Sequence, residues 1–341
     1  MRKKDFLTLV FLLNFAVLLS ACNPFVLSGS PTPFNHPTVE IKSTTIDNSY
    51  NNTKVTQGSY LAQIDDRLYY HYENTLGEKS DYIITNNHYE KSDENLVYDF
   101  IYDGQLLDMS SVPFKRFDSI TGKYSVYDRI QIPTELKDYS SAVCNGTLFL
   151  ESEKDIYRYN GKTFELWATW DEIGRKGRKA LYDVYIDGDC IYYSESDEEN
   201  EKTTIYQYNN ATKKIESLET KLISPSALIE NDGCVYYELM SGALYKADFN
   251  NKTVKQVFDD TAMIWSINMY KDTVCLCVES DDSGIYVSEK NGNFKKICDF
   301  SGLVNIPNEL YIVDETYFYY IVNNGYLYRV TRDGSQTEQV F

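Results

Sequence analysis

The chain has 341 residues, of which 43% are hydrophobic, 25% charged and 15% aromatic, and this composition excludes wholesale disorder and collagen-like structure. The 33 basic and 51 acidic residues give a formal charge of -18, which disfavours binding to the phosphates of nucleic acids. The 31 tyrosines against 17 glycines favour strands.

The first residues predict the compartment. Residues 2–4 are basic, and residues 6–19 form an apolar run that is shorter than the roughly 20 residues of a membrane-spanning helix. Such a charged start and short apolar run are typical of a secretory signal. The run leads directly into Leu19-Ser20-Ala21-Cys22, which resembles the bacterial lipobox. An ordinary signal peptide with a chance cysteine remains the alternative.

The lipobox resemblance implies that residues 1–21 are removed and that Cys22 becomes a lipidated N-terminus. Two or more acyl chains, such as palmitate, would hold the protein stably on a membrane. Removing three basic residues and one acid gives (33 - 3) - (51 - 1) = -20 for the mature chain. We therefore expect a lipoprotein at the outer, extracytoplasmic face of the bacterial cytoplasmic membrane.

A tether follows the lipidated cysteine. Residues 22–57 contain four of the eight prolines together with many Ser, Thr and Asn, a composition typical of extended linkers. Residues 38–42 alternate in polarity, so a short strand that pairs with the folded domain remains an alternative there. The domain itself is predicted over residues 58–341.

The domain is built from a repeat of about 42 residues. Its first element is a strand with two large residues in the middle, seen as Leu68-Tyr69-Tyr70, Leu148-Phe149-Leu150, Ile191-Tyr192-Tyr193, Val235-Tyr236-Tyr237, Val274-Cys275-Leu276 and Phe318-Tyr319-Tyr320, with a weak copy at Leu106-Leu107-Asp108. The second element has a central Tyr, seen as Ile156-Tyr157-Arg158, Ile205-Tyr206-Gln207, Leu244-Tyr245-Lys246, Ile285-Tyr286-Val287 and Leu327-Tyr328-Arg329. Turn pairs that tolerate positive φ follow it, at Asn160-Gly161, Asn251-Lys252, Asn291-Gly292 and Asp333-Gly334.

Four short strands per unit predict an all-β fold, the β-propeller, because a single four-stranded blade exposes two apolar faces that only a ring of blades can bury. The predicted units are 60–95, 96–136, 137–178, 179–222, 223–261, 262–304 and 305–341, which gives seven blades. Six or eight blades remain open because the second unit is poorly patterned. An irregular pair of β-sandwiches is the alternative fold.

The last unit carries a resemblance. Tyr319-Tyr320, then Tyr326-Leu327-Tyr328-Arg329 and Asp333-Gly334-Ser335, resemble the repeats of the low-density-lipoprotein-receptor type propeller. The chain is also similar to uncharacterised, Tyr-rich bacterial lipoproteins of a family of unknown function. The receptor repeat has Thr-Asp where this chain has Ser194-Glu195, so the six blades and the ligands of the receptor do not carry over.

Six cysteines remain besides Cys22: Cys144, Cys190, Cys234, Cys275, Cys277 and Cys298. Cys190 and Cys234 begin equivalent strands of neighbouring blades, and packed sheets lie about 10 Å apart, beyond the roughly 7 Å Cα limit of a disulfide. We therefore expect reduced thiols, with Cys298 the most reactive. No metal site is expected, because the chain lacks CxxC pairs and has only three histidines.

The ligand face of a propeller carries the loops between second and third strands and the connections between blades. Residues expected there come from the stretch 170–179 and the acidic loops 195–201 and 279–283: Trp170, Arg175, Lys176, Arg178, Lys179, Asp197, Glu198, Asp281 and Asp282. The acidic loops lack the EF-hand spacing and are interpreted as solvated. The basic stretch is interpreted as neutralised by the 195–201 loop, and Trp167, Trp170 and Trp265 as blade packing rather than sugar platforms.

No catalytic residue, cofactor or nucleic-acid partner is expected. The chain has no G-x-S-x-G, phosphate loop or histidine cluster, and His71 is interpreted as structural. The preferred function is therefore a non-catalytic binding or scaffold module for a protein or a glycan. A surface glycan hydrolase or lyase that uses a carboxylate pair, and a sensory ectodomain, are the alternatives.

Overall fold

The computed structural model describes residues 61–341 except 74–78, 87, 93–99, 103, 110–111, 119, 135, 137–138, 145, 178, 182–183, 198, 201, 221–224, 232, 240–242, 259–261, 272, 291, 302–309, 312–314 and 323–324. The expected signal peptide, Cys22 and the tether lie outside these residues. In the described part of the chain, every helix is too short or too polar to cross a bilayer.

The described residues form four-stranded antiparallel sheets, here called blades 1 to 7 in chain order. Blades 1 to 3 comprise β1 (Leu61–Ile64), β2 (Arg67–Glu73), β3 (Lys79–Thr85) and β4 (His88–Lys91); β5 (Phe100–Tyr102), β6 (Gln105–Asp108), β7 (Lys115–Asp118) and β8 (Lys123–Val126); and β9 (Ser140–Cys144), β10 (Thr147–Glu151), β11 (Asp155–Tyr159) and β12 (Phe164–Thr169).

Blades 4 to 7 follow the same plan. They comprise β13 (Tyr185–Asp187), β14 (Cys190–Asp197), β15 (Lys202–Asn209) and β16 (Lys214–Thr220); β17 (Pro225–Asn231), β18 (Cys234–Leu239), β19 (Leu244–Asp248) and β20 (Thr253–Gln256); β21 (Met263–Tyr270), β22 (Thr273–Glu279), β23 (Gly284–Ser288) and β24 (Phe294–Asp299); and β25 (Leu310–Tyr311), β26 (Tyr317–Val322), β27 (Tyr326–Thr331) and β28 (Thr337–Gln339).

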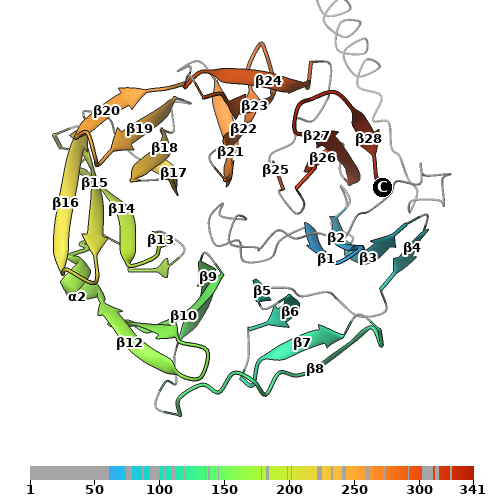
Figure 1. The fold of residues 1–341 in the computed structure, drawn as a ribbon, viewed down its shortest axis with the longest axis horizontal. Coiled ribbons are helices and arrows are strands. Elements are labelled where there is room, and N and C mark those ends of the chain that lie inside the picture. Colours follow the sequence, from blue (N-terminus) through green and yellow to red (C-terminus); the bar gives the residue numbers. More distant parts are fainter. Residues whose placement is uncertain are drawn as a thin grey trace, which may run out of the picture. The chain divides into compact units, whose positions relative to one another are not determined.

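The seven blades are arranged around a central axis as a β-propeller, and the first strand of each blade lies nearest the centre (Figure 1). Each blade falls inside one of the seven units predicted from the repeat, so the predicted fold class and blade count are confirmed. The weak second unit forms blade 2, with Leu106 and Leu107 buried in β6. The count of seven excludes the six-bladed arrangement of the receptor type.

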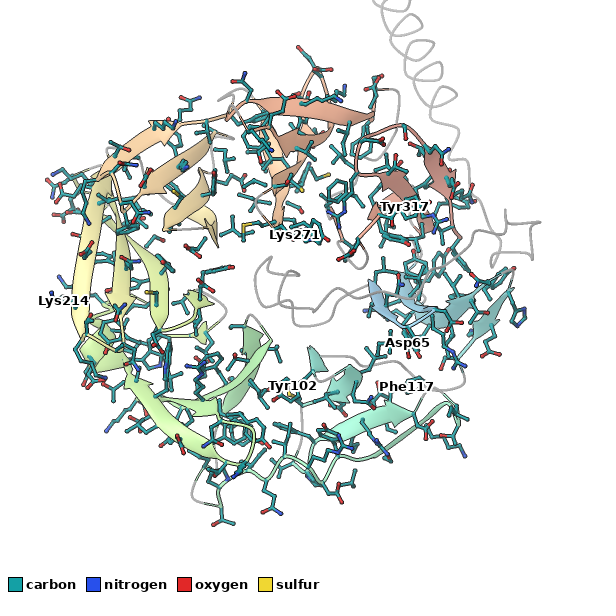
Figure 2. The ribbon with its side chains drawn as sticks, in the orientation of Figure 1. Asp65, Tyr102, Phe117, Lys214, Lys271 and Tyr317 are labelled. Carbon is teal, nitrogen blue, oxygen red and sulfur yellow. The ribbon has the colours of Figure 1, made fainter. Side chains whose placement is uncertain are left out.

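Paired large residues in the second strands explain how neighbouring blades hold together. Successive side chains of a strand point to opposite faces of its sheet. On β14, Tyr193 joins a core formed with blade 3, whereas its neighbour Tyr192 joins the core formed with blade 5. Side chains fill the spaces between the sheets in this way around the ring (Figure 2). The repeat therefore encodes packing on both faces of every blade.

The predicted hairpin turns have the backbone that their residues favour. Gly161 and Gly334 have φ of 91° and 78°, and Lys252, which follows Asn251, has φ of 54°. These values lie in the left-handed region, which glycine enters at no steric cost. The turns set the order of the strands within each blade.

One helix interrupts the all-β pattern between blades 3 and 4. The helix α2 (Trp170–Ile173) begins at Thr169, whose hydroxyl accepts a hydrogen bond from the Glu172 amide at 3.1 Å, and it ends at Gly174 in the left-handed conformation. The Glu172 carboxylate reaches back to the Thr169 amide, so the start of α2 is a capping box. At four residues it was too short to produce a helical pattern in the sequence.

Blades 1 and 7 meet through aromatic packing. Phe341 lies against Tyr70, Tyr82 and Tyr89, with ring centroids 5.4, 4.6 and 5.3 Å away. The Tyr70 hydroxyl donates to the Gly325 carbonyl of blade 7 at 2.7 Å. As far as the structure describes the chain, each of these two blades consists of four consecutive strands, and side chains join one blade to the other.

Strand direction gives the ring two faces. Loops between second and third strands and the connections between blades lie on one face, called here the connection face. Turns between first and second strands, and between third and fourth strands, lie on the opposite one, the turn face. This division follows from the alternating direction of the strands in each blade.

Candidate functional site

The connection face carries the basic stretch 170–179 beside the acidic loop that follows β14. Glu195 accepts hydrogen bonds from the backbone amides of Lys176 and Gly177, at 2.9 and 3.1 Å. Its carboxylate therefore ties the two segments together.

Two cations of this stretch have partners within the fold. Lys179 pairs with Asp171 at 3.1 Å, and the Arg175 guanidinium lies 5.8 Å from the centre of the Tyr193 ring. The partners of these two cations are Asp171 and the Tyr193 ring rather than the acids of the 195–201 loop, which was expected to neutralise the stretch. The predicted Arg178 lies outside the described residues.

The acidic loops on this face are organised by their own hydrogen bonds. Asp197 accepts from the amide and the side chain of Asn200, and these bonds hold the pKa of Asp197 below its ordinary value. Asp282 pairs with Lys296 at 2.6 Å, which lowers the pKa of Asp282. Asp281 is exposed, and Glu198 lies outside the described residues.

Within the described ranges, no group of three or more His, Cys, Asp or Glu side chains is placed to hold a metal ion.

The three tryptophans differ in exposure. Trp170 was expected on the ligand face, but it is fully buried because α2 turns its apolar side into the core between blades 3 and 4. Trp167 is half-buried, with its ring 5.2 Å from that of Phe149. Trp265 has 46% of its surface exposed, so the blade-packing interpretation is wrong for this residue.

His71 belongs to β2 and faces Asp81 of β3. Its Nδ1 lies 2.5 Å from the Asp81 carboxylate, which is 4% exposed. A buried carboxylate needs such a partner. The pair therefore stabilises the buried Asp81 carboxylate within blade 1.

Burial sets the chemistry of the cysteines. The six cysteines of the described chain are thiols in buried or half-buried positions. Burial raises the pKa of Cys144 and of Cys275 to about 12. Burial also raises the pKa of Cys298, whose thiol lies 3.6 Å from the Tyr320 hydroxyl. Because the thiolate is the reactive form, burial lowers the reactivity of Cys298 as it does for the other buried thiols, and its place as the most reactive of the six stays a prediction.

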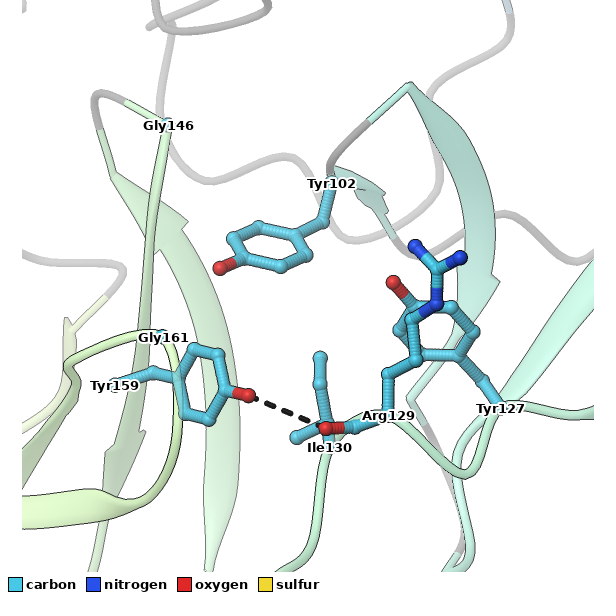
Figure 3. Close-up of a pocket in the computed structure, with 7 residues that line it drawn as sticks. All are labelled: Tyr102, Tyr127, Arg129, Ile130, Gly146, Tyr159 and Gly161. Atoms are coloured by element: carbon cyan, nitrogen blue, oxygen red, sulfur yellow. Dashed lines mark hydrogen bonds between the residues drawn. The ribbon is translucent and has the colours of Figure 1, made fainter.

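A pocket of about 660 Å³ opens between blades 2 and 3 (Figure 3). Its lining consists of Tyr102, Tyr127, Arg129, Ile130, Gly146, Tyr159 and Gly161, and we call it the Tyr–Arg pocket. Tyr102 ends β5, whereas Gly146 and Gly161 lie in the two turns of blade 3. These three residues lie at the turn-face ends of their strands, whereas Tyr127, Arg129 and Ile130 come from the connection between blades 2 and 3.

The connection between blades 2 and 3 completes this pocket. The Tyr159 hydroxyl donates to the Arg129 carbonyl at 3.2 Å, which fixes the backbone of the connection against blade 3. Ile130 is buried beside it, while the Arg129 side chain is exposed. The exposed guanidinium thus belongs to a segment whose backbone is fixed.

Tyrosine hydroxyls and ring faces dominate the interior. The rings of Tyr102 and Tyr159 stand nearly perpendicular at 74°, with centroids 6.3 Å apart. Burial is the largest cause that raises the pKa of Tyr159, and the nearby Tyr127 adds to this effect. The Tyr159 hydroxyl therefore stays protonated and can donate a hydrogen bond. The pocket thus combines flat apolar faces, hydroxyl groups and one guanidinium, and no carboxylate contributes to its described lining.

Sequence reasoning missed the Tyr–Arg pocket. Tyr102, Arg129 and Tyr159 are far apart in the chain, and Tyr102 lies in the poorly patterned second unit. The only available signal was the Asn160-Gly161 turn after Tyr159, which marks the end of a third strand.

The chain matches no protein-family model, and no curated protein matches it. Among solved structures, it is similar to the computationally designed Ika8 protein, with a TM-score of 0.47, 10% identity, and coverage of 87% of this chain and 88% of that one. For the extracellular domain of a hybrid two-component system from B. thetaiotaomicron, the TM-score is 0.47 at 12% identity, and the match covers 78% of this chain and 39% of that chain. For YCF48 bound to D1 peptide, the TM-score is 0.45 at 11% identity, and the match covers 89% of this chain and 98% of that chain. At these sequence identities, no residue role and no ligand of the matched proteins is assigned to this chain.

Proposed function

We propose that the chain is a non-catalytic binding protein, held at the outer face of the cytoplasmic membrane by acyl chains on Cys22, that takes a glycan in the Tyr–Arg pocket. The observation that carries the ligand class is the described lining, which has three tyrosines and one arginine but no carboxylate. The anchor rests on the lipobox resemblance of residues 19–22.

Three properties of the pocket support a sugar ligand. Its volume lies within the range of about 300–1,000 Å³ that is usual for ligand sites. Tyrosine combines an apolar ring with a hydroxyl at its edge, which matches the apolar faces and the hydroxyl groups of a pyranose. Arg129 adds donors that can bind ring or substituent oxygens. Together they offer contacts to both kinds of surface that a sugar presents.

Binding is favoured over hydrolysis by the same lining. Glycosidases cleave with two carboxyl groups about 5–9.5 Å apart, one of which acts as an acid. The described lining of the Tyr–Arg pocket contains no such pair. The pocket therefore offers recognition without the groups for that chemistry.

The ligand proposal is tested with the detergent-solubilised full chain on a glycan array, followed by calorimetric titration of the best sugar. We expect Tyr102→Ala and Arg129→Gln each to weaken binding at least tenfold, about 1.4 kcal/mol. Tyr326→Ala is the control, because Tyr326 is equally half-buried but belongs to β27. Unchanged affinity in both pocket variants would refute the site, and release of reducing sugar would instead show an enzyme.

The anchor has its own test. We expect Cys22→Ser to abolish labelling by a clickable fatty acid and to move the protein out of the membrane fraction, since the acyl chains are attached through that thiol. Cys298→Ser is the control, because Cys298 lies in the propeller. A Cys22→Ser protein that still carries label would contradict the lipobox interpretation.

A further inference from the structure

Trp265 lies on the innermost strand of blade 6, near the start of β21 and therefore on the connection face. The pairing of β21 with β22 shifts register between Ile264 and Ser266, so Trp265 is the extra residue of a β-bulge. Bulges redirect side chains and are common next to binding sites. The bulge explains how a large indole remains 46% exposed while Ile264 beside it is buried.

Glu279 fixes the orientation of this indole. The Trp265 Nε1–H donates to the Glu279 carboxylate at 2.7 Å. Met263, directly opposite Glu279 in the pairing of the two strands, is 50% exposed. An exposed ring, a flexible thioether and a carboxylate therefore lie together where β21 begins and β22 ends. Neither the Tyr–Arg pocket nor the blade cores use them.

The electrostatics of this group favour a cation. The face of an indole carries the negative part of its quadrupole, and tryptophan is the best aromatic partner for Lys and Arg side chains. The Glu279 carboxylate adds a full negative charge beside the ring, and the whole chain carries a formal charge of -18. The thioether of Met263 can adapt to the stem of a long side chain. Each component attracts a basic side chain on a flexible apolar stem.

We propose that Trp265, Glu279 and Met263 form a docking site for an arginine or lysine side chain of a protein partner. This site lies on blade 6, away from the Tyr–Arg pocket between blades 2 and 3, and does not depend on the glycan proposal. The propeller would then engage a protein through blade 6 while the Tyr–Arg pocket stays open to another ligand.

The test uses the detergent-solubilised full chain and fluorophore-labelled tetra-arginine amide, with binding read by anisotropy and Trp fluorescence read in parallel. We expect saturable binding that changes the Trp emission and weakens as salt is raised, because ion pairing is screened. Trp265→Ala and Glu279→Gln should each weaken binding about tenfold, and Trp265→Phe should weaken it less, since phenylalanine retains part of the ring interaction.

Matched probes and variants separate this site from general attraction to an acidic protein. Glu153→Gln removes the same charge from an exposed position in the β10–β11 loop on the same face, so it should leave the affinity within about twofold. Tetra-citrulline amide, which lacks the charge, should not bind. Equal losses in Glu153→Gln and Glu279→Gln, or full binding by Trp265→Ala, would overturn the proposal. Salt-independent binding of cellobiose at Trp265 would overturn it in favour of a sugar platform.

Discussion

Lys296 shows how a single residue organises an acidic loop. Its ammonium group lies 2.6 Å from Asp282 and 2.7 Å from Asp299, and the Tyr286 hydroxyl also donates to Asp282. Hydrogen bonding to Lys296 is the largest cause that lowers the pKa of both aspartates. The loop after β22 is therefore held by charge pairing within blade 6.

This pairing predicts a pH dependence of stability. Both aspartates have an ordinary pKa of 3.8, which folding lowers, so the unfolded chain binds protons first as the pH falls. Their contribution is complete above pH 3.8 and is lost as the pH falls through the lowered values. Lys296→Met should therefore flatten the acid side of a plot of thermal midpoint against pH. Lys295→Met, at an exposed position next to it, should keep the wild-type slope; equal slopes in both variants would contradict the assignment.

Strand geometry depends on small irregularities at the element scale. The pairing of β23 with β24 shifts register between Ile285 and Tyr286, directly after Gly284. A Cβ atom on Gly284 would collide with the carbonyl oxygen of Cys298 on the neighbouring strand. Blade 6 therefore requires glycine at this position, and the sequence pattern did not single it out.

The close approach predicts a stability loss for Gly284→Ala. We expect about 1–3 kcal/mol, as for overpacked sites, because backbone rather than a flexible side chain must move. Urea unfolding measures the effect. Gly177→Ala is the control, since its Cβ would make only ordinary contact with the Glu195 side chain. Similar losses for the two variants would show that the contact across β23 and β24 is not the cause.

The strands and turns predicted from the sequence agree with the structure best at the scale of single elements. The alternation in strands such as β14 and the turn pairs at Gly161 and Gly334 predicted the elements, because both depend on neighbouring residues. The helix α2 and the bulge at Trp265 escaped prediction. A four-residue helix has no period to detect, and a bulge is defined by its partner strand rather than by its own sequence.

At the scale of the whole molecule, the ring closes where blade 7 packs against blade 1. Phe341 is 2% exposed and packs on tyrosines of blade 1, although about 250–280 residues separate the two in sequence. These aromatic contacts resist the separation of blades 1 and 7. Closure of the ring therefore depends on these aromatic side chains.

We expect Phe341→Ala to cost about 3–5 kcal/mol and to speed hydrogen exchange in blades 1 and 7 first. The control is Phe149→Ala, which removes a ring of the same size from the core between blades 3 and 4. Its exchange should rise in those blades instead. Uniform acceleration around the ring in both variants would show that closure has no separate role.

The sequence by itself determined the all-β class, the division into seven units and the residues that face both sides of each blade, because these follow from periodicities within about 42 residues. The tertiary structure decided which distant residues meet. Tyr102, Arg129 and Tyr159 form one pocket, and Glu195 binds the amide of Lys176, only because neighbouring blades pack at one particular depth and rotation. That placement is set by the fit of side chains between sheets, which no local pattern records.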